Sequence, residues 1–593
     1  MQILGVSCFY HDAAAAILKD GVLLAAAEEE RFSRKKHDFD FPINAINFCL
    51  DAAGLGSKDL DYVIFYEKPF IKFERILLTT IGAFPRSWGM FRESMITWLL
   101  DKLWIKQIIH EKLGVPSEKI LFSEHHMSHA ASAYLCSPFD KAAIITVDGV
   151  GEWATATLGK AEGNNITILK EIRFPHSLGL LYSAFTAFLG FEVNEGEYKV
   201  MGMAPYGEPK YVDKVYKLIE SGDDGAFWLN MKYFSFHYST SRTFNKRFAE
   251  LFGNPRDHKL HFFTPSSGYP EYFGPKPKNY EELASLNQHY ADIAASIQRV
   301  TEEIILKMAN YLYKETHFEN LCIGGGVGLN CVANGRILRE SEFKRIYVQP
   351  AAGDGGAAIG AAFYLYNSIL NNPRRFVLNH VYWGQDYSNS QIKKFLEENK
   401  IKYEYIENDD RLFEKTADYL IEGKVVGWFQ GRFEWGPRAL GNRSILADAR
   451  RQDMKDVINT KIKFREPYRP FAPSVLAEMA EEFFELEDSW NQPAARFMLL
   501  VTPVKVDKKS LVPAITHVDG SARPQLVFKD INPRYYKMIE RFYQKTGVPL
   551  VLNTSFNLKG EPIVNTPSDA YSTFIRSGMD RLVLGNFIIS RPN

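Results

Sequence analysis

A predicted helix that leads into a predicted buried strand, over residues 124–147, most constrains what this chain can fold into. The stretch reads EHHMSHAASAYLCSPFDKAAIITV, and its last six residues are rich in β-branched side chains, as in a strand. Asp148 and Gly149 follow directly, so a carboxylate stands at the strand end, where α/β folds usually hold ligands. The segment therefore predicts an α/β domain with a site at the carboxyl edge of its sheet.

Two histidines in the predicted helix point to a metal ion. His125 and His129 are four residues apart, so in a helix their imidazoles lie on one face and can hold one ion. Together with Asp148 they suit a transition metal such as Fe, Zn or Mn, and spacing does not choose among these. The alternative is a pair of hydrogen-bonded helix histidines beside an ordinary strand-end aspartate. The pair by itself leaves both interpretations open.

The chain repeats its own beginning, in pattern rather than in identity. A first group of predicted strands includes a hairpin closed by Lys-Asp-Gly at 19–21, and a second group has glycine-containing turns in the corresponding places. The predicted strands lie at 2–7, 13–18 and 22–27, and again at 142–147, 153–158 and 166–173. We therefore expect two related units in the first part of the chain.

Two glycine-rich turns follow later in the chain. Residues 320–335 read NLCIGGGVGLNCVANG, a short strand, four glycines and the start of a helix. Free backbone N–H groups at a helix N-terminus suit a nucleotide, although the spacing matches neither the P-loop nor the Rossmann fingerprint. A second turn places Asp354 between Gly353 and Gly355, which gives a second strand-end carboxylate to set beside Asp148.

The last third of the chain carries arginines on loops shaped by glycine and proline. The clearest example is residues 431–450, GRFEWGPRALGNRSILADAR, and similar loops surround Arg469 and Arg523. The guanidinium fork matches a phosphate dianion, whereas the alternative is a set of surface salt bridges with nearby carboxylates. Three such loops in one region favour an anion site.

Length and composition limit the number of domains and the classes of function that the chain can have. A chain of 593 residues predicts two or more domains, and the crowding of Asn, Pro and Arg at 367–385 divides it into 1–370 and 371–593. Lys+Arg and Asp+Glu number 71 each, which argues against a nucleic-acid binder or a membrane-surface protein. Five scattered cysteines and an N-terminus without a signal-peptide pattern predict a cytoplasmic protein. The oligomeric state, a homo-oligomer included, stays open.

The motifs occur together in one order. They are GVSCFYHDAAAAILKDGVLLAAAEEERFSRKKH, HHMSH, VDG, GGGVGLN, GDGGAAIGAA, GRFEWGPRALGNRSILAD, YRPFAPS, DGSARPQ and LNTSFN. In this combination the chain resembles the O-carbamoyltransferases of nodulation-factor and antibiotic biosynthesis, over nearly its whole length. The resemblance implies an α/β protein with a duplicated actin-like ATPase domain (the ASKHA class), followed by a YrdC-like α/β domain that binds carbamoyl phosphate.

The resemblance also implies a reaction with ATP as co-substrate. Carbamoyl phosphate would be converted to carbamate, which would attack the α-phosphorus of ATP and give carbamoyl-adenylate and pyrophosphate. A hydroxyl of a small acceptor, a natural product or a sugar-like molecule, would then take the carbamoyl group and release AMP. An enclosed path between the two domains would protect the labile intermediates from water.

Site residues follow from the resemblance, position by position. The metal ligands would be His125, His129, Asp148 and Asp354, with iron(II) the expected ion. The nucleotide would touch Lys36, Asp148, Gly179, Gly325, Gly326 and Asn330. Carbamoyl phosphate would be held by Arg438, Arg443, Arg469, Arg523, Asn553 and Ser555. The catalytic residues would be Asp148 and His11, the latter facing the acceptor hydroxyl and able to help remove its proton.

Two rival functions use the same N-terminal features. A sugar kinase or other phosphotransferase of the actin-like class would need the nucleotide site but not the arginine loops. An ATP-gated binding protein would change shape with nucleotide and form no carbamoyl product. The products separate these functions, because a kinase releases ADP whereas a carbamoyltransferase of this type releases AMP and pyrophosphate.

Overall fold

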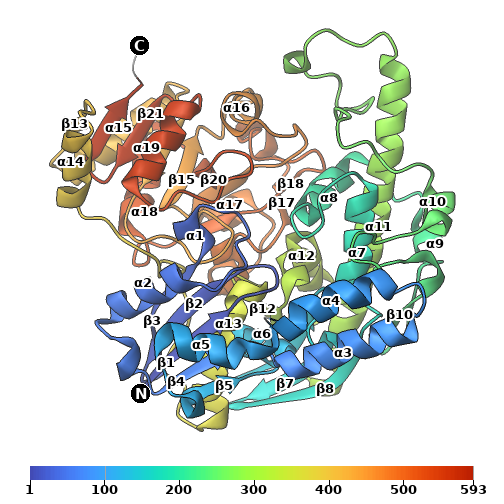
Figure 1. Cartoon of the computed structure of the whole chain (residues 1–593). Coiled ribbons are helices and arrows are strands. Elements are labelled where there is room, and N and C mark those ends of the chain that lie inside the picture. Colours follow the sequence, from blue (N-terminus) through green and yellow to red (C-terminus); the bar gives the residue numbers. More distant parts are fainter. Residues whose placement is uncertain (101, 592–593) are drawn as a thin grey trace. The chain divides into compact units, whose positions relative to one another are not determined.

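The structure, a computed structural model, describes residues 1–100 and 102–591, and its contacts separate them into two compact units. The first unit comprises Met1–Glu29 and Phe39–Leu378, and the second comprises Glu30–Asp38 and the chain from Asn379 onward. In Figure 1 the first unit runs from blue to yellow, and most of the second runs from yellow-brown to red. A division of function at 370/371 stays a prediction. The packing adds that Glu30–Asp38, which contains the short helix α1 (Glu30–Ser33), belongs with the C-terminal unit.

The first sheet of the N-terminal unit has five strands in the order β3-β2-β1-β4-β5. The strands are β1 (Gln2–Ser7), β2 (Ala14–Lys19), β3 (Val22–Glu28), β4 (Tyr62–Phe65) and β5 (Ile120–Phe122). β1, β2 and β3 pair antiparallel, whereas β4 pairs parallel with both β1 and β5. The predicted opening strand and the hairpin after it are confirmed.

The second sheet repeats this arrangement, with the order β12-β11-β6-β7-β8. Its strands are β6 (Lys141–Val147), β7 (Ala154–Glu162), β8 (Asn165–Arg173), β11 (Asn320–Gly324) and β12 (Arg345–Val348). β6, β7 and β8 pair antiparallel, and β11 pairs parallel with β6 and β12. The predicted internal repeat is therefore real at the level of topology. This duplicated sheet is the actin-like ATPase fold expected for the first part of the chain.

Helices α6 (His125–Tyr134) and α13 (Asp354–Phe363) are buried almost throughout and touch both each other and the sheets. Glycines allow the close approach. A Cβ on Gly5 of β1 would lie 2.0 Å from the carbonyl oxygen of Ala358 on α13. One on Gly360 of α13 would lie 1.9 Å from the carbonyl oxygen of Ser128 on α6. Small residues in α13 thus set how near the helix that carries the histidines can come.

The longest of the remaining helices of this unit is α11 (Tyr280–Thr316), which has 37 residues and is the long green helix of Figure 1. The others are α2 (Ile43–Ala53), α3 (Pro69–Gly82), α4 (Trp88–Leu100), α5 (Ile105–Leu113), α7 (Leu178–Phe188), α8 (Glu197–Met203), α9 (Val212–Val215), α10 (Lys246–Phe252) and α12 (Cys331–Glu340). A two-stranded ribbon, β9 (Ile219–Ser221) with β10 (Phe227–Leu229), lies in the loop-rich stretch before α11.

The C-terminal unit is built on a mixed sheet of eight strands, in the order β13-β22-β21-β14-β15-β20-β16-β19. They are β13 (Glu404–Tyr405), β14 (Val426–Phe429), β15 (Arg443–Ala447), β16 (Ala472–Leu476), β19 (Gln525–Val527), β20 (Leu550–Ser555), β21 (Arg581–Leu584) and β22 (Phe587–Ser590). The unit also contains a two-stranded ribbon, β17 (Thr502–Pro503) with β18 (Ser521–Ala522). Its helices are α14 (Asn389–Glu398), α15 (Asp409–Ile421), α16 (Met454–Ile458), α17 (Ala480–Phe483), α18 (Pro533–Thr546) and α19 (Pro567–Arg576). The unit is α/β, as expected, and its likeness to YrdC stays a prediction.

Among the described residues, none of the helices combines the length and the apolar character that crossing a lipid bilayer requires.

We predict that Gly360→Ala destabilises the N-terminal unit. The new methyl group would collide with the Ser128 carbonyl and with Ser132, so α6 and α13 must separate, and overpacking of this kind costs roughly 1–3 kcal/mol. Thermal unfolding should show a lower midpoint. The control is Gly89→Ala in α4, where a Cβ meets no atom within 4 Å and the midpoint should stay the same or rise. Equal midpoints for wild type and Gly360→Ala would contradict the close packing.

Candidate functional site

Four buried or half-buried side chains converge where the second sheet meets α6 and α13. They are His125 and His129 of α6, Asp148 after β6, and Asp354 at the start of α13. The donor atoms are separated by 3.0 Å (His125 Nε2 to Asp148 Oδ2), 3.2 Å (His129 Nε2 to Asp148 Oδ2), 3.1 Å (Nε2 to Nε2) and 3.7 Å (each Nε2 to Asp354 Oδ1). The structure thus brings together all four residues expected to hold the metal.

The donor set fits one divalent ion. Ligand atoms that share an ion at about 2.1 Å lie roughly 3.0–3.4 Å apart in octahedral or tetrahedral geometry, close to the separations found here. Two imidazole nitrogens that point at each other and at the same carboxylate also need a cation or an extra proton between them. Imidazole and carboxylate donors suit iron, zinc or manganese.

Without an ion, the protonation state of each side chain in the cluster depends on its charged neighbours. Burial would lower the pKa of His125, but hydrogen bonding with Asp148 and a contact with Glu67 raise it to about 10. Burial would raise the pKa of Asp148, whereas the two histidines hold it well below its ordinary range. His126, between them in sequence, instead faces Thr146, with its Nδ1 2.7 Å from the threonine hydroxyl. A bound cation would take the place of the protons that this cluster otherwise holds.

The predicted nucleotide glycines gather around Asp148. The backbone N–H of Gly326 donates to Asp148 Oδ1 at 3.2 Å, and Gly325 has a positive φ of 85°, which favours glycine. A Cβ on Gly325 would lie 2.3 Å from the carbonyl oxygen of Val147, and one on Gly179 would lie 2.6 Å from that of Asp148. The glycines therefore let three chain segments meet at the carboxyl end of β6.

The nucleotide-binding roles of two other residues, Asn330 and Lys36, stay predictions. Asn330 caps α12: its side-chain oxygen accepts from the N–H of Ala333, and its amide group exchanges hydrogen bonds with Gln298 of α11 at 3.0 and 3.1 Å. Lys36 belongs to the second compact unit, so its part in nucleotide binding stays a prediction. The cap is local, whereas the pairing with Gln298 joins segments 32 residues apart, which sequence spacing does not reveal.

His11 is held by two oxygen atoms. Its Nδ1 lies 2.6 Å from Asp12 Oδ2, and its Nε2 lies 2.8 Å from the carbonyl oxygen of Asn194. Burial would lower its pKa, but the hydrogen bond with Asp12 raises it to about 10, so the ring is doubly protonated near neutral pH. In this arrangement His11 donates hydrogen bonds and cannot accept a proton from a hydroxyl, which the sequence-based expectation had not included.

In the C-terminal unit a buried lysine contacts Ser555, one of the residues of the predicted anion site. Lys463 Nζ donates to Asn557 Oδ1 at 2.7 Å, to the Asn557 carbonyl oxygen at 3.0 Å and to Ser555 Oγ at 3.2 Å. Burial, and then the charges of Arg465 and Arg469, lower the pKa of Lys463 well below its usual range. A buried cation beside further cations favours an anion between them.

Sequence reasoning missed Lys463. The available signal was the basic run at 461–469, KIKFREPYR, directly before the arginine loop that was identified. Its fourth basic residue, Arg469, is half-buried, with Nη1 3.7 Å from Glu466 Oε2. The deciding fact is burial, since only 3% of Lys463 is exposed, and sequence spacing does not report burial in a loop.

The other predicted phosphate-binding residues lie around the same strand ends. The side-chain amide of Asn553 in β20 donates to the carbonyl oxygen of Ala439, which follows Arg438, and to Gln525 Oε1, two residues after Arg523. Arg523 follows β18 and is half-buried, and within the described residues its guanidinium pairs with no carboxylate. The segments that carry Arg438, Arg523 and Asn553 are thus tied together.

Arg443 has a different role from the predicted one. It is fully buried, its guanidinium donates to the carbonyl oxygens of Gln430, Gly431, Asn442 and Gln385 at 2.5 to 3.2 Å, and it lies 3.7 Å over the ring of Phe429. Glu434 complements it, because its Oε1 accepts the backbone N–H groups of Leu440, Asn442 and Arg443 at 2.8 to 3.0 Å. The pair shapes the loop 431–443, so we leave Arg443 out of the anion site.

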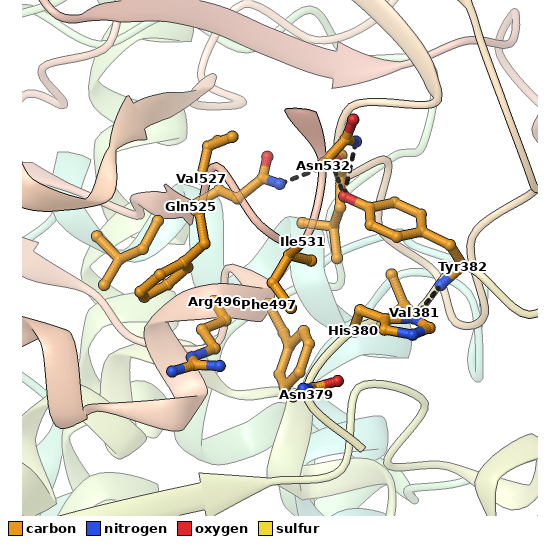
Figure 2. A pocket seen from close by; sticks show the side chains of 13 residues that line it. Asn379, His380, Val381, Tyr382, Arg496, Phe497, Gln525, Val527, Ile531 and Asn532 are labelled. Carbon is orange, nitrogen blue, oxygen red and sulfur yellow. Dashed lines mark hydrogen bonds between the residues drawn. The ribbon is translucent and has the colours of Figure 1, made fainter. Parts of the chain in front are cut away.

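A small cavity adjoins this region, and Figure 2 shows its lining. Gln525 donates to the carbonyl oxygen of Leu440 at 2.7 Å, and Asn532 donates to the Tyr382 hydroxyl at 3.0 Å. Most of the remaining lining is apolar, with Arg496 over the ring of Phe528 at 4.3 Å. In the described part of the chain none of the six predicted phosphate-binding residues lines this cavity, so the two sites are distinct.

The match to known families decides the identity of the chain. Residues 2–363 match the family model described as the carbamoyltransferase N-terminus, and residues 417–591 match the carbamoyltransferase C-terminus. The chain belongs to the carbamoyltransferase family. The resemblance identified from the motifs is confirmed, and the enzyme class with it.

Two relatives match nearly the whole chain, and a third matches about half of it. A protein of Synechocystis sp., sll1178, is 48% identical and covers 100% of this chain and 97% of its own length. The nodulation protein NolNO of Sinorhizobium fredii is 37% identical, over 98% of this chain and 79% of its own. The 3'-hydroxymethylcephem-O-carbamoyltransferase of Streptomyces clavuligerus is 33% identical over 48% of this chain and 51% of its own.

Among solved structures, full-length HypF in the phosphate- and nucleotide-bound form aligns over 62% of this chain and 56% of its own. The sequence identity is 15% and the TM-score 0.32. The fold of the N-terminal unit is evident from its own strand order and strand directions.

We predict that His129→Ala removes the bound metal. Loss of one of four donors should lower the affinity for the ion by about tenfold or more, at least as much as loss of an outer partner of a ligand usually costs, so the purified protein should retain less metal. Metal analysis of the purified protein after loading with iron(II) measures this. His126→Ala is the matched control, because His126 is equally buried on the same helix but faces Thr146. Wild-type metal content in His129→Ala would refute its assignment as a ligand.

Proposed function

We propose that this carbamoyltransferase uses ATP to transfer the carbamoyl group of carbamoyl phosphate to a hydroxyl of a small acceptor. The observation that carries the proposal is the four-donor cluster at Asp148, set against the glycine loop at Gly325 and Gly326. It combines a seat for a divalent ion with backbone N–H groups, the combination that nucleotide phosphates require. The relatives named as O-carbamoyltransferases support the same reaction class.

Carbamoyl phosphate would bind in the C-terminal unit. Lys463, Arg469 and Arg523 supply positive charge, and Ser555 and Asn553 supply polar groups on the adjoining β20. Arginine forks match the phosphate oxygens, and the low dielectric around Lys463 strengthens its attraction for an anion. Water would cleave the bond between the carbamoyl group and the phosphate, which leaves carbamate and inorganic phosphate.

ATP would bind in the N-terminal unit at the carboxyl end of β6. A carbamate oxygen would attack the α-phosphorus, the bond to the β-phosphate bridging oxygen would break, and pyrophosphate would leave. Backbone N–H groups of the glycine turn that begins at Gly325 would neutralise the phosphate oxygens. A divalent ion held by His125, His129, Asp148 and Asp354, with iron expected, would supply Lewis-acid neutralisation of phosphate charge.

The acceptor hydroxyl would then attack the carbamoyl carbon of the adenylate, and AMP would leave. His11 is near the beginning of the same unit, but its two hydrogen bonds make it a donor. It can therefore orient the hydroxyl or stabilise negative charge on the leaving phosphate, but it does not take up the hydroxyl proton. AMP is a good leaving group, so the hydroxyl needs only weak activation.

We predict that the protein, given ATP, carbamoyl phosphate and a pool of hydroxyl metabolites, releases AMP and pyrophosphate. Chromatography of the nucleotides measures AMP against ADP, and mass spectrometry finds the metabolite that gains one carbamoyl group. Omitting carbamoyl phosphate should abolish AMP release and is the control. Release of ADP, independent of carbamoyl phosphate, would support a kinase of the same fold and overturn the proposal.

We predict that Arg523→Ala and Lys463→Met impair use of carbamoyl phosphate while ATP binding survives. A hydrogen bond to a charged group contributes about 1.5–3 kcal/mol, so the KM for carbamoyl phosphate should rise roughly 10–100-fold. Steady-state kinetics and ATP titration calorimetry measure the two effects separately. Arg541→Ala, which removes a surface ion pair with Asp410, is the control and should leave both unchanged. Equal loss of ATP binding in Arg523→Ala would contradict the division of labour between the units.

A further inference from the structure

A buried ion pair lies directly behind one of the two histidines of the metal cluster. Glu67, which follows the end of β4, and Lys72 of α3 approach to 2.6 Å between Oε2 and Nζ, and each side chain is 4% exposed. The same Glu67 oxygen lies 3.5 Å from Nδ1 of His125, on the ring edge opposite the cluster. Glu67 is thus the only charged group in the described chain found next to that nitrogen.

Burying two opposite charges costs desolvation free energy, which their mutual attraction seldom offsets. Replacing a buried ion pair with apolar side chains is often neutral or stabilising, so stability alone does not account for one. A specific reason is available here, because a histidine that binds a metal through one nitrogen almost always donates the other N–H to a carboxylate or carbonyl. Glu67 occupies that outer position for His125.

The surroundings of His125 leave little freedom for its ring. A Cβ on Gly151 would lie 2.9 Å from the imidazole, and the ring of Tyr66 packs against it with centroids 5.4 Å apart. The backbone N–H of His125 donates to both carboxylate oxygens of Glu152 at 3.0 Å. Packing therefore fixes the plane of the ring, and what stays unspecified is which of its nitrogens carries the proton.

We propose that Glu67 and Lys72 form a positioning pair for His125: Glu67 faces Nδ1 and takes a hydrogen bond from its N–H, which leaves Nε2 to bind the cation, and Lys72 holds the Glu67 carboxylate in place through the 2.6 Å ion pair. This inference rests on the metal site of the proposed function. Lys72 is itself held, with Nζ 4.1 Å from the ring centre of Tyr10. In this structure the Nδ1 atoms of both histidines lack a hydrogen bond within normal distance and angle, but only that of His125, among the described residues, has a carboxylate as near as 3.5 Å.

The two single substitutions each leave a buried unpaired charge, so the double variant is the fair test. Glu67→Gln leaves the Lys72 ammonium buried without its partner, and Lys72→Met does the same to the Glu67 carboxylate. The double variant Glu67→Gln/Lys72→Met removes both charges. The matched control is Glu124→Gln, because Glu124 directly precedes His125 but is 58% exposed and pairs with Lys68 at the surface. Thermal unfolding of all variants reports whether the fold survives.

The experiment titrates full-length protein with Co(II) and follows the visible absorption, which reports both affinity and coordination. We expect the double variant to bind Co(II) about 10–100-fold more weakly and with an altered spectrum, as loss of an outer-sphere carboxylate does elsewhere. Glu124→Gln should match wild type. In the Glu67→Gln background, Lys72→Met should cause no further loss of affinity, since Lys72 acts only through Glu67.

Two results would overturn the inference, and they are distinguishable. If wild type binds Co(II) and the folded double variant binds it with equal affinity and an unchanged spectrum, the positioning role falls and the metal site stands. If wild type binds no Co(II), the metal assignment behind the proposed function falls together with the positioning role. Release of AMP and pyrophosphate tests the reaction independently of either outcome.

Discussion

The N-terminal unit depends on one buried electrostatic cluster, the two histidines of α6 between the carboxylates Asp148 and Asp354. Such a set is tolerable inside a protein only when each charge has a partner or the group holds a cation. The helices that present these side chains approach one another through glycine, at Gly360 toward α6 and at Gly5 toward α13. The small residues of the GDGGAAIGAA segment are thus part of the site, since they set the distance between the ligands.

Duplication explains why the site lies where it does. In each of the two sheets a central strand has an antiparallel neighbour on one side and a parallel neighbour on the other. The carboxyl ends of β6 and β11 therefore lie side by side, and they deliver Asp148 and the glycine turn to the same point. The hydrogen bond from Gly326 to Asp148 joins the glycine turn to the four-donor cluster, the two parts of the proposed ATP site. One feature of topology thus serves both parts of the proposed chemistry.

The C-terminal unit uses buried charge in two different ways. Glu434 and Arg443 form hydrogen bonds with backbone groups of the loop 431–443 and give the loop its shape. Their charged groups are therefore occupied by contacts within the protein. Lys463, beside Arg465 and Arg469, is a buried cation whose neighbours add to its charge rather than oppose it. The first arrangement stabilises a conformation, and the second favours an anionic ligand. Membership of the carbamoyltransferase family gives that ligand a chemical identity in the proposal, carbamoyl phosphate.

The sequence by itself determined the elements, the internal repeat, the family and the histidine pair, because periodicity, turn residues and motif order are local properties of a chain. It also named the carboxylates that meet the histidines, through resemblance. Only the tertiary structure decided that Arg443 faces carbonyl oxygens while Lys463 faces Ser555, that His11 is held by Asp12 and Asn194, and that Glu67 reaches His125. The physical reason is that burial and partner choice depend on strand pairing between segments far apart in sequence, which no local pattern records.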